Sequence, residues 1–288
     1  MSTDLIIAPA PSPMQIQATN DDHLIDLFVS TRRGPRTRVL YEYTIRQYRE
    51  QVNKPIRETT MGDLMAYAVT LEHYRSGTQK QRLATIKSLF TFAHKIGYVA
   101  FNVGAAIPLP ERKDTLSERI LTPEEVMRLI VATSANPKHE LVLRLLYRSA
   151  ARVSEIVVAI WRDLIPRDGD EAQITLFGKK GKTRNVLIPR SLYDRLVELR
   201  GEAGPDERIL GMSRQRIWQV IRATAKRAGL EQKVSPHWLR HAHASHALEN
   251  GASVKLVSET LGHESVATTS HYLHARPGES SGRFLKVG

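Results

Sequence analysis

The chain of 288 residues contains no cysteine. That absence excludes disulfide bonds, cysteine-ligated zinc, iron–sulfur clusters and thiol nucleophiles. No apolar run approaches the roughly 18 residues of a membrane-spanning helix. The short apolar run at residues 5–7 has no positively charged segment before it, so it does not resemble a signal peptide. We therefore expect a cytoplasmic protein that does not bind a membrane.

Acidic residues are the scarcer charged class, with 30 Asp and Glu against 42 Lys and Arg, which gives a formal charge of +12. Hydrophobic residues make up 41% of the chain, enough for a packed core, so the chain is not a disordered basic tail. Basic residues exceed acidic ones both before and after residue 110. The excess charge points first to a polyanionic partner, and solubility alone is the other interpretation.

Proline positions and helical patterns divide the chain into two expected domains. Residues 1–18 carry three prolines among small residues and are expected to form a flexible leader. A helical pattern fills residues 19–107, and residues 108–120, with two prolines and a charged run, are expected to be a linker. Residues 121–288 form the second expected domain. The expected fold is mainly α with a small antiparallel β-sheet.

Apolar periodicity and capping residues predict the individual elements. Apolar side chains recur at helical spacing between Leu83 and Ala93, and Thr122 followed by Pro123 is a typical helix start. Alternating apolar residues predict strands over 173–177 and 185–188. The segment between these strands carries three lysines and an arginine and is expected to be a hairpin tip. The predicted helices span residues 23–29, 40–53, 60–71, 78–96, 140–147, 154–159, 213–228, 236–250, 253–261 and 265–272.

Four segments of the second domain stand out when they are taken together. Singly, each has an ordinary interpretation: Arg152 can pair with Glu155, Lys179 can be a solvated turn residue, and Tyr272 can be a half-buried core aromatic. It is their joint order along the chain that is unusual. The set consists of Arg152, Lys179, His237, Arg240, His263 and Tyr272.

This order and spacing resemble those of the tyrosine recombinase, or phage integrase-like, family. Arg152 in Ser-Ala-Ala-Arg-Val-Ser-Glu matches the first family arginine, Lys179 the β-hairpin lysine, and His237 with Arg240 the His-x-Leu-Arg-His box. His263 matches the Leu-Gly-His motif, and Tyr272 follows it at the usual offset of nine residues. The resemblance covers residues 21–276. It implies a helical core-binding domain that clamps DNA, followed by a catalytic domain.

The departures from the family pattern are small. Ala150 and Ala151 replace the usual glycine and its neighbour, and His243 stands where an aromatic residue is common. None of these removes a reacting group. The tail at residues 273–288 is broken by a Pro-Gly pair, which leaves open how protomers would dock on one another.

The resemblance implies a site-specific DNA recombinase in which Tyr272 cleaves a phosphodiester and leaves a 3′-phosphotyrosine. Tyrosine is a weak nucleophile with a reference pKa of about 10, so it needs a base, and His237 is the residue we expect in that role. Arg152 and Arg240 suit the charged transition state, because a guanidinium is always charged and binds two oxygens at once. His263 would add another donor, and Lys179 would protonate the leaving 5′ oxygen.

This chemistry requires no metal, ATP or other cofactor, and none is expected. A zinc site built on His237 and His241, which are four residues apart, is a weaker alternative because no third ligand type accompanies them. His243 and His246 are expected to be surface or core histidines. The covalent phosphotyrosine would conserve the energy of the broken bond, so that a second 5′-hydroxyl can attack it.

The expected partners are double-stranded DNA and further copies of the chain, as a tetramer on paired DNA sites. Most DNA contacts should go to phosphates, so they carry no sequence information. Two alternatives stay open: a type IB topoisomerase-like enzyme that nicks and reseals, and a non-catalytic DNA-binding regulator on the same scaffold. The candidate DNA-contacting residues are Thr78, Lys80, Arg82, Lys87, Arg214 and Arg216.

Overall fold

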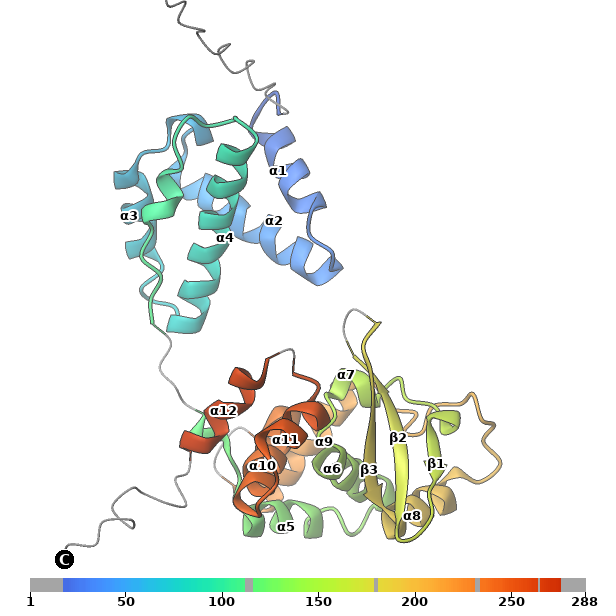
Figure 1. The fold of residues 1–288 in the computed structure, drawn as a ribbon. Coiled ribbons are helices and arrows are strands. Elements are labelled where there is room, and N and C mark those ends of the chain that lie inside the picture. The colour runs from blue at the N-terminus through green and yellow to red at the C-terminus, as the bar shows by residue number, and fades with distance from the viewer. Residues whose placement is uncertain (1–17, 112–115, 179–180, 231–233, 264, 276–288) are drawn as a thin grey trace, which may run out of the picture. The chain divides into compact units, whose positions relative to one another are not determined.

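The structure is a computed structural model that describes residues 18–111, 116–178, 181–230, 234–263 and 265–275. The chain divides into two compact units, Met1–Lys113 and Asp114–Gly288 (Figure 1). Each unit has its own hydrophobic core.

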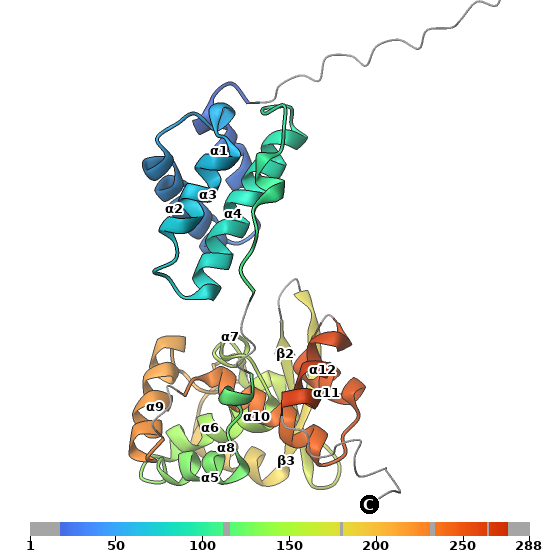
Figure 2. The same cartoon turned by 90° about the vertical axis from the view of Figure 1, so that its left-hand side faces the viewer.

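The N-terminal unit is a bundle in which α4 packs against both α1 and α2 (Figures 1 and 2). Tyr48 lies at its centre and meets Tyr67 edge to face, with ring centroids 5.1 Å apart. Thr60 and Asp63 form a capping box that begins α3. The elements are α1 (Asp21–Ser30), α2 (Pro35–Val52), η1 (Ile56–Glu58), α3 (Met61–Thr70), α4 (Ser76–Lys95) and η2 (Val103–Ala106).

The C-terminal unit begins with η3 and combines helices with one three-stranded antiparallel sheet of order β1-β2-β3. The pairing places Ile174 of β2 between Leu164 of β1 and Val186 of β3, and all three side chains are buried. The first elements are η3 (Ser117–Arg119), α5 (Pro123–Val131), α6 (Pro137–Ser149), α7 (Val153–Ile156), η4 (Trp161–Asp163), β1 (Leu164–Pro166), β2 (Glu171–Phe177) and β3 (Thr183–Pro189). The rest are α8 (Arg190–Arg200), α9 (Arg214–Arg227), α10 (Pro236–Glu249), α11 (Val254–Leu261) and α12 (Val266–Ala275).

Helix α10 is the element that organises this unit. It contacts α5, α6, α9, α11 and α12, while α6 and α8 pack against strand β3 (Figure 2). Because α10 is surrounded on several sides, its small residues Ala242 and Ala244 are fully buried and allow close helix approach. The motif His237–His241 therefore lies at the meeting point of several helices.

The expected fold class is confirmed, and most predicted elements coincide with observed ones. One strand and one α-helix were missed, as were the short 3-10 helices: the strand is β1, which is only three residues long, and the helix is α8, which follows directly on β3. The predicted helix at 40–53 in fact begins at Pro35, where proline occupies the first helical turn. Within the described residues, no helix is both long enough and apolar enough to cross a membrane.

Candidate active site

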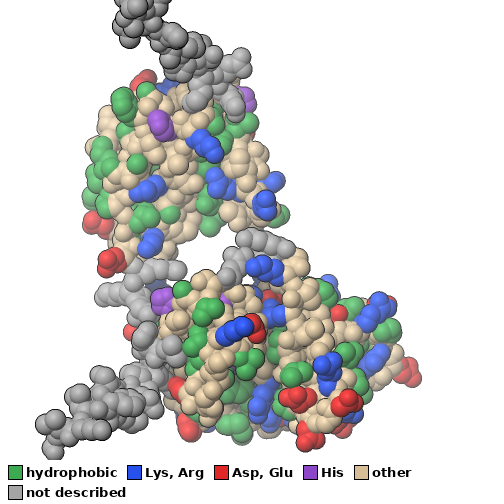
Figure 3. All heavy atoms as spheres, in the orientation of Figure 1, with side chains coloured by type: hydrophobic (Ala, Val, Ile, Leu, Met, Phe, Trp, Pro, Cys, Tyr) green, Lys and Arg blue, Asp and Glu red, His purple; other side chains and the backbone are tan. Residues whose placement is uncertain are grey.

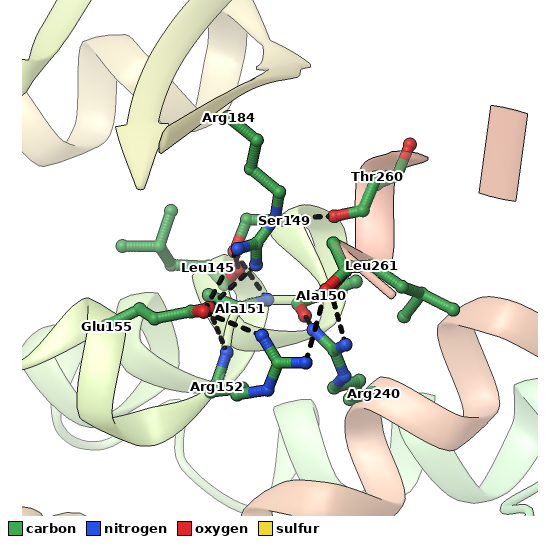
Figure 4. A network of polar contacts seen from close by, with 11 residues as sticks. Leu145, Ser149, Ala150, Ala151, Arg152, Glu155, Arg184, Arg240, Thr260 and Leu261 are labelled. Atoms are coloured by element: carbon green, nitrogen blue, oxygen red, sulfur yellow. Dashed lines mark hydrogen bonds and ion pairs between the residues drawn. The ribbon is translucent and has the colours of Figure 1, made fainter. Parts of the chain in front are cut away.

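Five segments that are far apart in sequence converge on one region of the C-terminal unit. They are the turn between α6 and α7, strand β3, helix α10, the turn after α11, and helix α12. Figure 4 shows the polar contacts among the first four. The convergence depends on buried arginines that hydrogen-bond to backbone carbonyls and to one carboxylate. It brings together Arg152, His237, Arg240, His263 and Tyr272, five of the six residues expected from the sequence.

Glu155 binds both Arg152 and Arg184 in this network, and its side chain is only 3% exposed. Arg184 of β3 donates from Nη1 and Nη2 to the two carboxylate oxygens at 3.0 and 2.7 Å, and Arg152 Nη1 donates to Oε1 at 2.9 Å. The backbone N–H of Arg152 donates to Oε2 at 2.8 Å. Burial alone would raise the pKa of Glu155, but the hydrogen bonds and charges of Arg184 and Arg152 outweigh it and lower the pKa. Glu155 is therefore a fixed anion that orients two guanidinium groups.

Arg184 also connects the sheet to α11, because its Nε donates to the carbonyl oxygen of Thr260 at 2.7 Å. Its side chain is 11% exposed, so it acts inside the protein. Arg152 is 28% exposed and keeps an open side toward solvent. Of the two arginines bound to Glu155, Arg152 is thus the one placed to meet an external ligand.

Arg240 is nearly fully buried and binds two carbonyls from different segments. Its Nη1 donates to Ala150 and its Nη2 to Leu261, so it joins the end of α6 to the end of α11 (Figure 4). Burial and the nearby charges of Arg152 and Arg184 lower the pKa of Arg240 to about 9. The group still carries its charge at neutral pH, and an anion placed beside it would relieve the repulsion.

Ala150 presents its carbonyl to Arg240 from an unusual backbone conformation, with φ +48°. This is the left-handed region that glycine adopts freely and other residues adopt at a cost. Ala150 caps α6 there and reverses the chain toward Arg152. The conformation explains why glycine is usual at this point of the motif and why a residue as small as alanine can replace it.

His263 follows Gly262, which ends α11 in the left-handed conformation with φ +62°. The Nδ1 atom of His263 lies 2.8 Å from the hydroxyl oxygen of Thr269 on α12. Burial, together with repulsion from Arg240, Arg152 and Arg184, lowers the pKa of His263 to about 4. His263 is therefore neutral at pH 7.

Tyr272 projects from α12 into the apolar cluster that contains Val257 and Leu261, and it is 6% exposed. Its hydroxyl lies 2.7 Å from Nδ1 of His241. Burial raises the pKa of Tyr272, while the charges of Arg240 and Arg152 oppose that rise. Those two charges stabilise the phenolate, so the tyrosine lies within the electrostatic field of the arginines.

His237 is also present in this region, on the same helix as His241 and with a ring centroid 6.5 Å away. Its pKa is lowered by burial and by the charges of Arg240 and Arg152, which indicates that it lies close to both arginines. That His237 acts as the base for Tyr272 therefore stays a prediction. In the structure the Tyr272 hydroxyl contacts His241.

Lys179 lies outside the described residues. Its neighbour Gly178 closes the base of the hairpin by donating its N–H to the carbonyl oxygen of Lys182 at 2.7 Å. A Cβ atom added to Gly178 would lie 3.6 Å from Oε1 of Glu155. The end of strand β2 therefore lies beside the Glu155 carboxylate.

The other histidines of α10 have structural partners. Nδ1 of His243 lies 2.8 Å from the carbonyl oxygen of Tyr147, and Nδ1 of His246 lies 2.9 Å from the hydroxyl of Tyr147. Nε2 of His246 lies 2.9 Å from the carbonyl oxygen of Leu121. Among the described residues, no group of three or more His, Asp or Glu side chains could hold a metal ion.

The candidate DNA-contacting residues differ in their surroundings. Arg82 is buried and stacks on Tyr74, with its Cζ 4.2 Å from the ring centroid. Lys87 donates to the carbonyl oxygens of Ala105 and Ile107 at 2.7 and 3.2 Å. Both are engaged within the N-terminal unit. Thr78 and Arg216 are exposed, while Lys80 and Arg214 are half-buried.

The two histidines with the largest pKa shifts predict how stability depends on pH. The pKa values of His241 and His263 are about 4 in the folded chain, below their ordinary value of 6.5, because burial and nearby positive charges disfavour the imidazolium. The unfolded chain therefore binds more protons, so their contribution is complete above pH 6.5 and is lost as the pH falls toward 4. Urea unfolding at pH 7, 6, 5 and 4 should show this loss. The chain that carries both His241→Asn and His263→Asn should lose less free energy of unfolding over the same pH range. An equal dependence of unfolding free energy on pH in the two chains would contradict the assignment.

Residues 119–279 match the phage integrase family. Tyrosine recombinase XerD of Bifidobacterium longum (strain NCC 2705) is 32% identical over an alignment that covers 89% of this chain and 92% of the relative. Tyrosine recombinase XerC of Xanthomonas campestris pv. campestris (strain B100) is 33% identical, with 72% of this chain and 67% of the relative covered.

Solved structures show the same fold. The crystal structure of XerA recombinase matches with a TM-score of 0.50 at 25% identity, and the match covers 89% of this chain and 94% of that chain. A lambda integrase dimer bound to a COC′ core site matches with a TM-score of 0.74 at 20% identity, covering 93% and 97%. A lambda integrase tetramer bound to a Holliday junction matches with a TM-score of 0.69 at 18% identity, covering 86% and 78%. These comparisons favour the recombinase over the topoisomerase-like and non-catalytic alternatives.

Proposed function

Since the chain belongs to the phage integrase family and is a tyrosine recombinase that cleaves and rejoins DNA, we propose that Tyr272 is the nucleophile of the cleavage step. The observation that carries this assignment is the placement of Tyr272 within the field of Arg152 and Arg240, the two charges that oppose the rise of its pKa. A phenol that attacks a phosphate must lose its proton, and positive charge beside it lowers the cost of that loss.

Arg152 and Arg240 form the phosphate pocket in this proposal, together with His263 and His237. The region holds three guanidinium groups and one buried carboxylate, Glu155, so its net charge is positive. One scissile phosphodiester would partly balance that charge. Arg152, with its open side, would bind the non-bridging oxygens directly, and buried Arg240 would stabilise the charge that builds up on them in the transition state.

The step is an in-line displacement at phosphorus. The Tyr272 oxygen gives its proton to a base and forms a bond to phosphorus, and the bond from phosphorus to the 5′ oxygen breaks. The phosphate then joins the Tyr272 oxygen to the 3′ oxygen of the DNA strand. The 5′ oxygen leaves with the bonding electron pair and takes a proton from Lys179 as general acid. Rejoining is the reverse reaction, with the 5′-hydroxyl of the same or of another strand as the attacking group.

We also assign the DNA-contacting role to Thr78, Lys80, Arg214 and Arg216. Ser213 caps α9 and places Arg214 and Arg216 in its first turn, where both can reach a phosphate backbone. In the view of Figure 3, basic side chains spread over both units, whereas acidic side chains of the C-terminal unit gather near α8. Duplex DNA is the proposed substrate. Four copies on two DNA sites form the proposed active assembly, as in the tetramer of lambda integrase on a Holliday junction.

The test is to identify the residue that becomes linked to DNA. A duplex carrying the site that the purified chain protects in a footprint would be nicked close to the scissile phosphate, so that the short fragment with the newly freed 5′-hydroxyl diffuses away after cleavage. The trapped protein–DNA adduct would be digested with protease and sequenced by mass spectrometry. We expect the nucleotide to be attached to Tyr272. Attachment to any other residue would refute the assignment.

Arg82 and Lys80 provide a matched pair of substitutions in helix α4. Arg82→Gln should lower the free energy of unfolding of the N-terminal unit by about 2 kcal/mol, because the buried guanidinium loses its stacking on Tyr74 and its apolar contacts. Lys80→Gln should change the free energy of unfolding by less than about 0.5 kcal/mol. It should also make DNA binding less dependent on salt concentration, by the amount that corresponds to the loss of about one phosphate contact. Urea unfolding and binding titrations at several salt concentrations measure both effects. Equal changes in the free energy of unfolding and in the salt dependence of DNA binding for the two variants would contradict these assignments.

A further inference from the structure

We propose that His241 receives the phenolic proton of Tyr272 during DNA cleavage. This inference deepens the proposed function and rests on Tyr272 being the nucleophile. The sequence gives His241 no such role, because it is the residue that follows the arginine in the His-x-x-Arg motif. The role is assigned from the contact that His241, on α10, makes with Tyr272, on α12.

The contact has the geometry that proton transfer requires. His241 Nδ1 lies 2.7 Å from the Tyr272 hydroxyl oxygen, within hydrogen-bond distance, and the ring centroids are 5.7 Å apart. Among the described residues, His241 is the hydrogen-bond partner of that hydroxyl. In the tautomer that this inference assigns to His241, the hydroxyl donates to Nδ1 and the neutral imidazole carries its own proton on Nε2.

The surroundings of His241 keep its acceptor nitrogen unprotonated before DNA binds. Burial lowers the pKa of His241 to about 4, helped by the charges that face it: His237 and Arg240 from its own helix, Arg119 from η3, and His263 from the turn after α11. Tyr272 faces it from α12. At neutral pH the lone pair on Nδ1 is therefore available to the tyrosine.

Substrate binding would increase the basicity of His241 at the moment when it is needed. A phosphodiester anion among Arg152, Arg240 and His263 cancels part of the positive field that disfavours the imidazolium. As the Tyr272 oxygen bonds to phosphorus, its proton moves to Nδ1 of His241, while the 5′ oxygen departs with the bonding pair and is protonated by the general acid. The imidazolium of His241 returns the proton to Tyr272 when the strand is rejoined.

Two substitutions separate proton transfer from simple positioning. In His241→Asn, an amide oxygen can take the place of Nδ1 as hydrogen-bond acceptor, but it cannot bind a proton in the neutral range. In His241→Leu, both properties are lost. His243→Asn is the matched control, because His243 lies on the same helix and contacts the carbonyl of Tyr147.

The assay is single-turnover cleavage of the nicked duplex between pH 5 and pH 9, with folding checked by urea unfolding and DNA binding by footprinting. We expect both His241 variants to bind DNA and to cleave it roughly 10²-fold to 10⁴-fold more slowly, the usual contribution of a general base. The wild-type rate should fall in acid as His241 becomes protonated, and the His241 variants should lack that fall. The His243 variant should keep both the wild-type rate and the wild-type profile.

A substrate with a sulfur atom at the bridging 5′ position completes the test. A thiolate leaves without protonation, so this substrate should restore a chain that lacks its general acid and should not restore one that lacks its base. We expect it to leave both His241 variants slow. Rescue of His241→Asn by this substrate, or wild-type cleavage by His241→Asn on the ordinary duplex, would overturn the inference. If Tyr272→Phe also forms the covalent adduct, the proposed function itself has failed.

Discussion

Replacement of Tyr272 by phenylalanine is expected to reduce covalent cleavage of DNA by roughly 10⁴-fold or more, because the variant retains the ring but has no oxygen to attack phosphorus. The ring fills a buried position among Val257, Leu261 and Ala244, and phenylalanine fills the same space. Among the described residues, the interaction lost is the hydrogen bond to His241, which costs about 1 kcal/mol. DNA binding and folding should therefore survive a substitution that removes the chemistry.

Tyr147→Phe is the control for this prediction. The Tyr147 hydroxyl lies 2.9 Å from Nδ1 of His246, so this substitution also deletes a hydroxyl that contacts a histidine of α10. Its effect on stability should be similar, and its effect on cleavage should be small. The two variants would be compared by adduct formation on a denaturing gel and by urea unfolding. An adduct formed by Tyr272→Phe, or an equal loss of cleavage in Tyr147→Phe, would contradict the role of Tyr272.

The sequence was sufficient to predict the parts of the site that depend on spacing. Arg152 directly precedes α7, and Arg240 lies three residues after His237 within α10. The spacing of nine residues from His263 to Tyr272 spans the short turn between α11 and α12. The αL conformation of Ala150 could also be suspected, because glycine is usual at this position of the motif. The same local reasoning predicted strands β2 and β3 from residues that alternate in burial.

The parts that were missed depend on contacts between distant segments. Arg184 was interpreted as one of several charges at a hairpin tip, whereas in the fold it is buried against Glu155, which is 29 residues away. His241 reaches Tyr272 only because α10 and α12 pack together, and Arg82 was expected at the surface of a helix that buries it. A charge pattern along the chain does not reveal which cations find a carboxylate or an aromatic ring in the folded state.

Glu155→Gln is expected to lower the free energy of unfolding by about 3–5 kcal/mol and to abolish most cleavage per folded molecule. Removing one partner of a buried ion pair leaves the other charge uncompensated, and here Arg184 and Arg152 both lose their anion beside the charge of Arg240. The glutamine amide would also place donor hydrogens against guanidinium donors. Arg152 would then no longer be held in the orientation that a phosphate requires.

Glu140→Gln separates the stability effect from the catalytic one. Glu140 is a carboxylate that is also largely buried, at 13% exposed, and that also binds two arginines, Arg144 at 2.7 Å and Arg195 at 2.9 Å, but it lies near the start of α6, away from the site residues. Glu140→Gln should destabilise the fold and leave the cleavage rate per folded molecule unchanged. A comparable loss of cleavage in both variants, measured at a temperature where each is folded, would show that Glu155 acts through stability alone.

Adding Arg184→Met to Glu155→Gln tests whether this network has two separable parts. The second substitution removes a buried charge that has lost its partner, so we expect the double variant to be more stable than Glu155→Gln alone. Cleavage should not return, because Arg152 still lacks the carboxylate that orients it. Recovery of both stability and cleavage would mean that the charge of Arg184, rather than the orientation of Arg152, is what Glu155 controls. The two measurements on one double variant therefore distinguish a carboxylate that neutralises the interior from one that positions the catalytic arginine.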